Sequence, residues 1–193
     1  MTKTDRTGRH LRADALRNRE RLMEEAKTAF TEQGPDVSLE EIARRAEVGI
    51  GTLYRHFPNR QAILEAVYRR EIEQLGAAAD RLLRELPPAE AMRQWLRLSI
   101  DYMATKKVIA AAFTAAVGNP SALYEFSGNL LAESIETLLA AAIAAGDVRP
   151  DVKTADIMAV MMGVAATTSA PDWRESAVRL TDILIAGLQS KPS

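Results

Sequence analysis

The stretch at residues 38–57, SLEEIARRAEVGIGTLYRHF, constrains the fold of this chain more than any other feature. Ser38 and Glu41 have the spacing of a capping box, in which the serine oxygen accepts an early helix N–H and the glutamate reaches back to the N–H of the cap. This predicts that a helix begins at about Leu39. Apolar residues then recur with a helical period, and the pattern predicts an end near Glu47.

A second short helix follows a predicted sharp turn. Gly49 offers the backbone freedom that such a turn needs, and Pro58 restricts the second helix to about 50–57. At about 100° per residue, Ile50, Leu53 and Phe57 point inward together. Two short helices joined by a tight turn are typical of a helix-turn-helix.

The opposite face of the second helix carries a guanidinium, a hydroxyl, a phenol, an imidazole and a bare glycine backbone. These groups suit DNA, because a guanidinium can donate two hydrogen bonds to a guanine edge and hydroxyl groups can bind phosphate oxygens. The alternative interpretation is a polar helix face that is only solvated. The residues concerned are Gly51, Thr52, Tyr54, Arg55 and His56.

The run VGIGTLYRHFPNR at residues 48–60 closely resembles the signature of the TetR family of bacterial transcription regulators, and the resemblance covers about Leu16 to Tyr68. It implies an all-helical homodimer whose N-terminal helices bind a palindromic operator, usually to repress, and whose C-terminal helices hold a small-molecule inducer. Gly49 departs from the commoner pattern, since many members carry a polar cap residue there. The DNA-binding residues that the resemblance implies are Ser38, Ile50, Gly51, Thr52, Tyr54, Arg55, His56 and Arg60.

The resemblance also implies separate roles within that set. Thr52, Tyr54 and His56 match backbone-contacting positions of the recognition helix, while Ser38 and Arg60 match phosphate contacts. Ile50, Gly51 and Arg55 stand at positions where base readout varies most within the family.

Composition narrows the classes of protein. Of 193 residues, 47% are hydrophobic and 26% charged, which is ordinary for a globular protein. The absence of cysteine excludes disulfides and thiolate metal sites. The longest apolar stretch is interrupted at Gly118-Asn119-Pro120, so we expect no membrane association and a cytoplasmic location.

The N-terminus is basic although the net charge of the chain is −1. Residues 1–21 hold seven basic against three acidic residues. We expect residues 1–11 to form a disordered arm, which is either a solvated tail or a segment that orders along DNA.

Helical periodicity and Gly or Pro breaks predict an all-α fold of about nine helices. A helix-turn-helix domain at residues 12–68 precedes a helical body at residues 69–193, in which ligand binding and dimerisation are expected. Asn59 is a predicted cap for the long helix that follows it. The expected helices are 13–33, 39–47, 50–57, 60–86, 89–105, 107–117, 120–145, 154–168 and 173–189.

One helix of the body has Trp95, Ser99 and Tyr102 on one face. Such a face either belongs to a plain helical core or borders a ligand cavity. The aromatic and methionine side chains suggest a small, mostly apolar or aromatic ligand, and no inward Arg or Lys is obvious enough to predict an anion. The candidate ligand-binding residues are Met92, Trp95, Ser99, Tyr102, Met103, Phe113, Tyr124 and Phe126.

The last two predicted helices are apolar around most of their circumference. Such helices must be covered on more than one side, and a second subunit would provide the cover. The candidate dimer residues are Ile157, Met161, Val164, Leu180, Leu184 and Leu188.

Catalysis has little support in the sequence. Only His10 and His56 are present, so no histidine dyad, triad or metal cluster can be assembled, and no nucleotide-binding glycine motif occurs. We therefore expect a dimeric, ligand-responsive transcription regulator without enzymatic activity, cofactor or metal. The alternatives are a helical small-molecule binding protein that does not bind DNA and an enzyme with an apolar pocket.

Overall fold

The chain is described by a computed structural model at residues 3–34, 36–117, 121–167 and 171–189, with side chains described from residue 13 onward except at 110–122. Within these ranges it is all-α, as predicted, and contains no strand. The helices are α1 (Lys3–Gln33), α2 (Leu39–Arg45), α3 (Ile50–His56), α4 (Arg60–Glu85), α5 (Pro88–Val117), α6 (Ser121–Ala144), α7 (Thr154–Ala166) and α8 (Trp173–Leu188).

Eight helices are found in the described ranges where the sequence predicts about nine. The two helices predicted at 89–105 and 107–117 form the single helix α5. The stretch at residues 105–107 contains neither glycine nor proline. No residue in it therefore removes a backbone N–H donor or favours a non-helical backbone.

α1 begins ten residues before the predicted start at residue 13 and ends at Gln33, as predicted. The backbone of residues 3–11, expected to be a disordered arm, is the first part of this helix. Residues 3–12 contain no proline and one glycine, Gly8, so a helix that is stable further along can extend through them.

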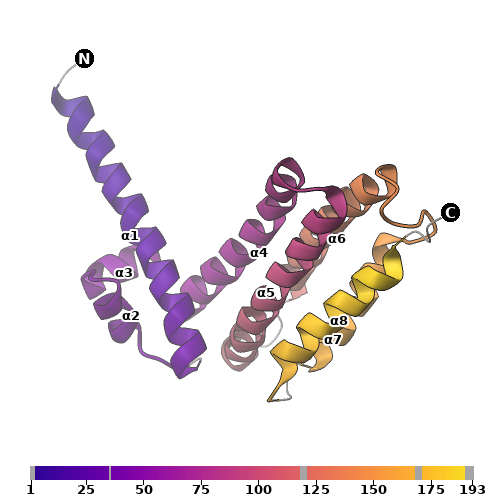
Figure 1. Ribbon diagram of the computed structural model, residues 1–193. Helices are drawn as coiled ribbons and strands as arrows, with labels where there is room; N and C mark the ends of the chain where they lie inside the picture. Colours follow the sequence, from indigo (N-terminus) through magenta and orange to yellow (C-terminus); the bar gives the residue numbers. More distant parts are fainter. Residues whose placement is uncertain (1–2, 35, 118–120, 168–170, 190–193) are drawn as a thin grey trace. The chain divides into compact units, whose positions relative to one another are not determined.

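The chain forms two compact units. The first consists of Met1–Tyr68 and Val108–Pro120. Here α1 packs against α2 and α3, and α2 packs against α3 (Figure 1). The core of this three-helix arrangement is apolar. Its largest fully buried side chains include Leu22, Phe30, Ile42, Leu53 and Phe57.

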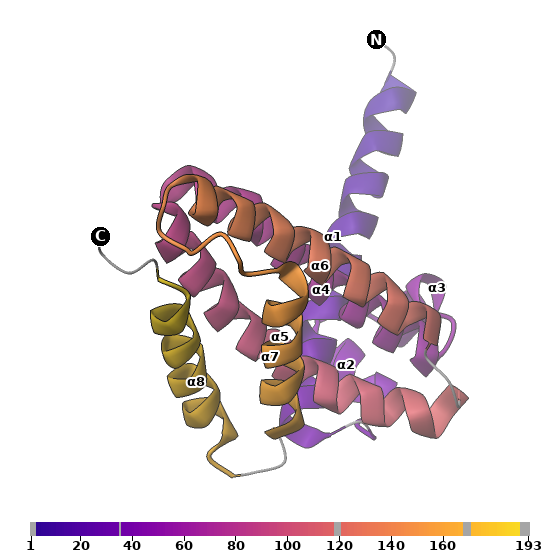
Figure 2. The same cartoon turned by 90° about the vertical axis from the view of Figure 1, so that its right-hand side faces the viewer.

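The second unit consists of Arg69–Lys107 and Ser121–Ser193. Within it, α5 runs behind the pair formed by α7 and α8 (Figure 2). Trp95 is fully buried and its indole N–H donates to the Leu75 carbonyl at 2.8 Å, which ties α5 to α4.

Two kinds of contact hold the helices of the second unit in place. α6 approaches α4 closely at Gly76, where a Cβ would lie 3.1 Å from Leu130 Cγ. α8 is joined to α5 by ion pairs: Arg93 and Arg97 contact Asp182 at 3.3 and 3.0 Å. Arg174 of α8 contacts Asp101 of α5 at 2.6 Å, so the two helices run antiparallel.

Candidate nucleic-acid interface

α2 begins with the predicted serine cap. Ser38 has extended backbone angles, and its hydroxyl oxygen accepts the N–H of Glu41 at 3.1 Å. The Glu41 carboxylate differs from the capping-box prediction, because it is held by guanidinium groups. It accepts Nε and Nη2 of Arg44, both at 2.7 Å, and Nε of Arg45 at 3.0 Å.

This charge cluster also reaches α1, since Arg45 donates to Glu32 at 2.8 Å. The hydrogen bonds from Arg44 and Arg45 lower the pKa of Glu41 to about 2. Glu41 in turn raises the pKa of Arg44, and Glu32 followed by Glu41 raises that of Arg45. Both arginines of α2 are therefore paired with carboxylates of the same unit, which makes them poor candidates for phosphate contacts.

The turn between α2 and α3 is made by a different residue from the one predicted. Glu47 has a φ of 52°, whereas Gly49 is extended with φ −63° and ψ 142°. The Val48 N–H donates to Ala43 O at 2.9 Å, and the Glu47 N–H to Arg44 O at 3.1 Å. This is the pattern of a helix end whose left-handed residue is usually glycine, and here Glu47 occupies that position. Gly49 is instead the N-cap of α3.

α3 is anchored by two of the three residues predicted to point inward. Leu53 and Phe57 are fully buried, and the Arg19 guanidinium of α1 lies 5.2 Å from the centre of the Phe57 ring. Ile50, the third, is 38% exposed, so the inward prediction is wrong for it. It is the first residue of α3, and no preceding turn of helix covers it.

The opposite flank of α3 is open. Tyr54 is 45% exposed, Gly51 and Arg55 are exposed, and Thr52 and His56 are half-buried. Among the residues whose side chains are described, none accepts a hydrogen bond from the Arg55 guanidinium. A helix of two turns thus offers an uncompensated cation, a phenol and a bare backbone on one side while its other side is fixed in the core.

Arg60 lies beside the start of α2. Its Nη2 donates to the Val37 carbonyl at 2.6 Å, directly before Ser38. Asn59, the predicted cap of α4, accepts the Ala62 N–H at 2.9 Å and confirms that assignment. The structure therefore brings Ser38 and Arg60, which are distant in sequence, to the same edge of the first unit.

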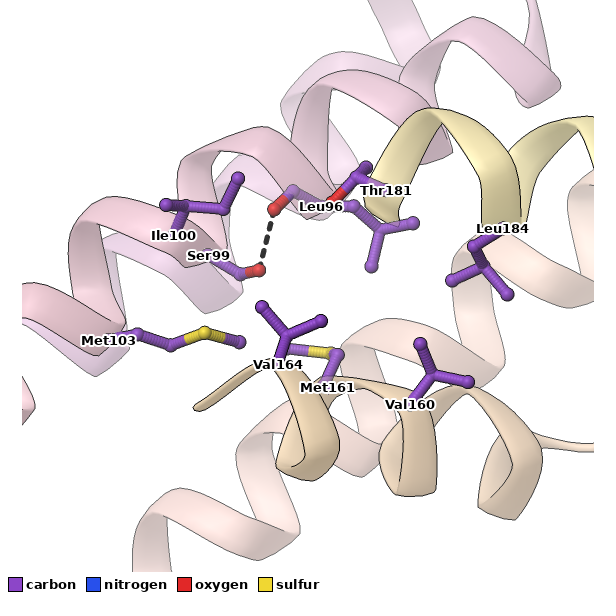
Figure 3. A pocket seen from close by; sticks show the side chains of 9 residues that line it. All are labelled: Leu96, Ser99, Ile100, Met103, Val160, Met161, Val164, Thr181 and Leu184. Carbon is purple, nitrogen blue, oxygen red and sulfur yellow. Dashed lines mark hydrogen bonds between the residues drawn. The ribbon is translucent and has the colours of Figure 1, made fainter. Parts of the chain in front are cut away.

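The candidate ligand residues do not form a single group. Met92, Trp95, Ser99, Tyr102 and Met103 are buried on the part of α5 that belongs to the second unit, whereas the Phe113 side chain lies outside the described residues. Ser99 and Met103 border a cavity between α5, α7 and α8 (Figure 3). This cavity measures about 10 Å³, room for roughly one water molecule.

The candidate dimer residues divide between two faces. Ile157, Met161, Val164 and Leu188 are buried within the subunit, while Leu180 is exposed and Leu184 is half-buried. The sequence-based set omits Met162 and Ile183, which are 64% and 67% exposed. A strict 3.6-residue period applied to α7 would have separated the two faces. The exposed face borders an apolar hollow of about 420 Å³ lined by Val160, Gly163, Val164, Leu180, Ile183 and Leu184.

Comparison with known protein families extends over most of the chain. Residues 22–67 match the family described as "Bacterial regulatory proteins, tetR family". Residues 87–190 match the family described as "Transcriptional regulator SbtR-like, C-terminal domain". The chain belongs to the TetR family.

Solved structures of TetR proteins resemble the chain over nearly their full length. The TetR transcriptional regulator SCO0520 from Streptomyces coelicolor is 43% identical, with a TM-score of 0.82, and the match covers 90% of this chain and 99% of that one. The TetR transcription regulatory protein from Mycobacterium vanbaalenii is 33% identical, with a TM-score of 0.79, covering 93% and 99%.

Among curated proteins the similarity is confined to a shorter segment. The HTH-type transcriptional regulator SAUSA300_2515 of Staphylococcus aureus (strain USA300) is 38% identical over 64 residues, which are 33% of this chain and 35% of that protein. The chain therefore spans about a third of the length of the curated relatives it matches. TetR proteins are transcription regulators with a DNA-binding N-terminal and a ligand-binding C-terminal domain, and they are typically not enzymes.

The described residues lack a membrane-spanning helix and a metal-binding cluster. No helix among them is long and apolar enough to cross a membrane. No three of their His, Asp or Glu side chains lie close enough together to hold a metal ion.

Proposed function

We propose that this TetR-family chain is a dimeric repressor that binds a palindromic operator through α3 and is released from it by a small-molecule inducer. The observation that supports DNA binding best is the two-sided character of α3. Leu53 and Phe57 hold one side in the core, while Tyr54 and Arg55 are exposed on the other. The Arg55 guanidinium has no acceptor among the residues whose side chains are described. Such a group on a rigid helix is suited to bidentate recognition of guanine in the major groove.

The other DNA contacts are assigned by their place around α3. Ile50 and Gly51 lie at the exposed start of the helix and would face base edges together with Arg55. Thr52, Tyr54 and His56 would contact the sugar–phosphate backbone, as would Ser38 and Arg60 from the edge of the unit. The basic N-terminal part of α1 would add phosphate contacts at residues 3–11.

Dimerisation is proposed through the exposed faces of α7 and α8. Met162 and Ile183 are each about two-thirds exposed in the single subunit, and Ile183 lines the apolar hollow between the two helices. Apolar surface of this kind is unfavourable in water and would be covered by the same surface of a second subunit. Two α3 helices of such a dimer would enter successive major grooves about 34–36 Å apart.

Operator binding is tested with DNA fragments that flank the gene of this protein. Arg55→Ala should cost about 1–3 kcal/mol and relax sequence preference at one position, because a bidentate guanine contact is lost. Affinity is measured by fluorescence anisotropy on a set of operators with single base changes.

The matched control is Arg179→Ala, which removes the same charge from an exposed position on α8. It should leave affinity and sequence preference unchanged. Equal losses in both variants would reject a base contact by Arg55. The absence of salt-dependent DNA binding by the unaltered protein would favour the alternative, a helical small-molecule binding protein. A DNA-binding regulator of this family would act in the bacterial cytoplasm.

A further inference from the structure

The face of α5 that carries Trp95, Ser99 and Tyr102 continues to a lysine. Lys106 lies eleven residues after Trp95, which is three helical turns, so its side chain projects from the same face. The indole N–H of Trp95 and the hydroxyl of Ser99 already donate hydrogen bonds to backbone carbonyls of the second unit. Trp95 donates to Leu75 O at 2.8 Å, and Ser99 donates to Leu96 O at 2.6 Å.

The Lys106 ammonium group, in contrast, lies over an aromatic ring. Its ammonium group lies 5.1 Å from the centre of the Tyr124 ring of α6, and the side chain is half-buried. Burial lowers the pKa of Lys106. No carboxylate among the side chains that the structure describes forms an ion pair with it, and residues 110–122 contain neither Asp nor Glu.

No charge among the described residues compensates this cation. Removing an ammonium group from water is unfavourable unless an anion or several acceptors replace the water, and the face of a phenol ring compensates only in part. The ammonium group therefore favours a negative charge that the described part of the protein does not supply.

A second cation lies near the same part of α6. The Arg69 guanidinium of α4 lies 4.8 Å from the centre of the Phe126 ring, two residues along α6 from Tyr124. Cations from α4 and α5 thus each contact an aromatic side chain near the start of α6. Buried Tyr102 and Met103 of α5 supply an apolar surface one turn before Lys106.

We infer that Lys106 is the anion-recognition group of the effector site, and that the effector is a monocarboxylate with an apolar body. This inference rests on the proposed function, since it names the chemical class of the inducer. The carboxylate would bind the ammonium group beside Tyr124, and the apolar body would lie against the aromatic side chains. It adds a carboxylate to the mostly apolar or aromatic ligand expected from the sequence, where no inward Arg or Lys was obvious enough to predict an anion.

The inference is tested with two pairs of compounds that differ only in charge, decanoate with decanamide and phenylacetate with phenylacetamide. Dissociation constants are measured by isothermal titration calorimetry on the full chain. In at least one pair the carboxylate should bind about tenfold or more tightly than the amide, as expected for a charge-assisted hydrogen bond. Lys106→Met keeps most of the side-chain volume and should reduce this ratio to about one.

Lys107→Met is the matched control, because Lys107 is the next residue and is exposed. It should keep the full ratio. Lys106→Gln serves as a second neutral variant, and circular dichroism establishes that each variant is folded. A preference for carboxylate that persists in both neutral Lys106 variants would overturn the inference. So would the absence of any carboxylate preference, or of any carboxylate binding at millimolar concentration, in the unaltered protein.

Operator binding without added compound is measured in parallel. Loss of operator binding by the unaltered protein contradicts the proposed function. Retained operator binding with no carboxylate preference contradicts only the assignment of Lys106 and the effector class.

Discussion

At the turn between α2 and α3, Glu47 adopts a conformation that glycine adopts at lower cost. Its φ of 52° brings the Cβ of an L-residue close to the following carbonyl, at a cost of roughly 1 kcal/mol. The carboxylate contacts Arg21 at 2.9 Å, but its side chain is 83% exposed, so this ion pair contributes little. The turn geometry therefore comes from the end of α2 and is maintained against the preference of the residue itself.

Glu47→Gly is expected to stabilise the first unit by about 0.5–1 kcal/mol, because glycine removes the left-handed penalty while adding some freedom to the unfolded chain. The free energy of unfolding is measured by urea denaturation at pH 7. Glu47→Ala is the control, since it loses the same carboxylate but remains an L-residue. A gain of equal size in Glu47→Ala would show that the carboxylate, and not the backbone, is unfavourable there.

On the scale of single elements, α2 is joined to its neighbours by charge as well as by apolar packing. Glu41 accepts hydrogen bonds from both arginines of α2, and Arg45 continues to Glu32 of α1. These interactions favour the ionised form of Glu41 and lower its pKa from 4.5 to about 2. The contribution of these bonds to the stability of the first unit therefore depends on pH in the acid range.

The sign of this dependence follows from the lowered pKa. The stabilisation is present in full above pH 4.5 and is lost as the pH falls toward 2, because protonation then removes the charge. Glu41→Gln should thus be less stable than the unaltered protein at pH 7, and the difference should shrink between pH 4.5 and 2. Urea midpoints measured across this range test the prediction.

Glu40→Gln is the control for the acid titration, since Glu40 is exposed on the same helix. It should differ from the unaltered protein by a smaller amount, because it leaves the hydrogen bonds from Arg44 and Arg45 to Glu41 in place. If the stability difference of Glu41→Gln stayed constant down to pH 2, the bonds to Arg44 and Arg45 would not hold the carboxylate ionised.

On the scale of the whole molecule, α7 and α8 expose an apolar face that one subunit leaves uncovered. Val160, Met162, Leu180 and Ile183 contribute to this face from the two helices. Gly163 lies beside the hollow, and a Cβ added there would meet nothing within 4 Å in the single subunit. A second subunit could therefore approach α7 closely at this position.

Ile183→Asp should convert the proposed dimer into monomers at micromolar concentration, because it places a charge in the centre of the buried surface. Sedimentation velocity measures the change. Leu16→Asp is a matched control, since Leu16 is 66% and Ile183 67% exposed, and Leu16 lies on α1. A dimer that survives Ile183→Asp unchanged would mean that association uses another surface.

Much of the fold follows from sequence because its signals are local. The cap at Ser38, the cap at Asn59 and the buried pair Leu53 and Phe57 depend on residues within about one helical turn. The same local patterns predicted the outward flank of α3 and hence the candidate DNA contacts. Ile50 was misplaced because a helical wheel does not show where the neighbouring core ends.

Contacts between distant segments decided the remaining features. The sequence by itself determined that the chain is all-α, where most helices begin and end, and that one short helix has an inward and an outward side. Only the tertiary structure decided that Arg45 pairs with Glu32, that Arg60 binds the Val37 carbonyl, and which face of α7 is covered. The physical reason is range: helix formation is governed by neighbours along the chain, whereas burial and charge compensation depend on which segments meet in space.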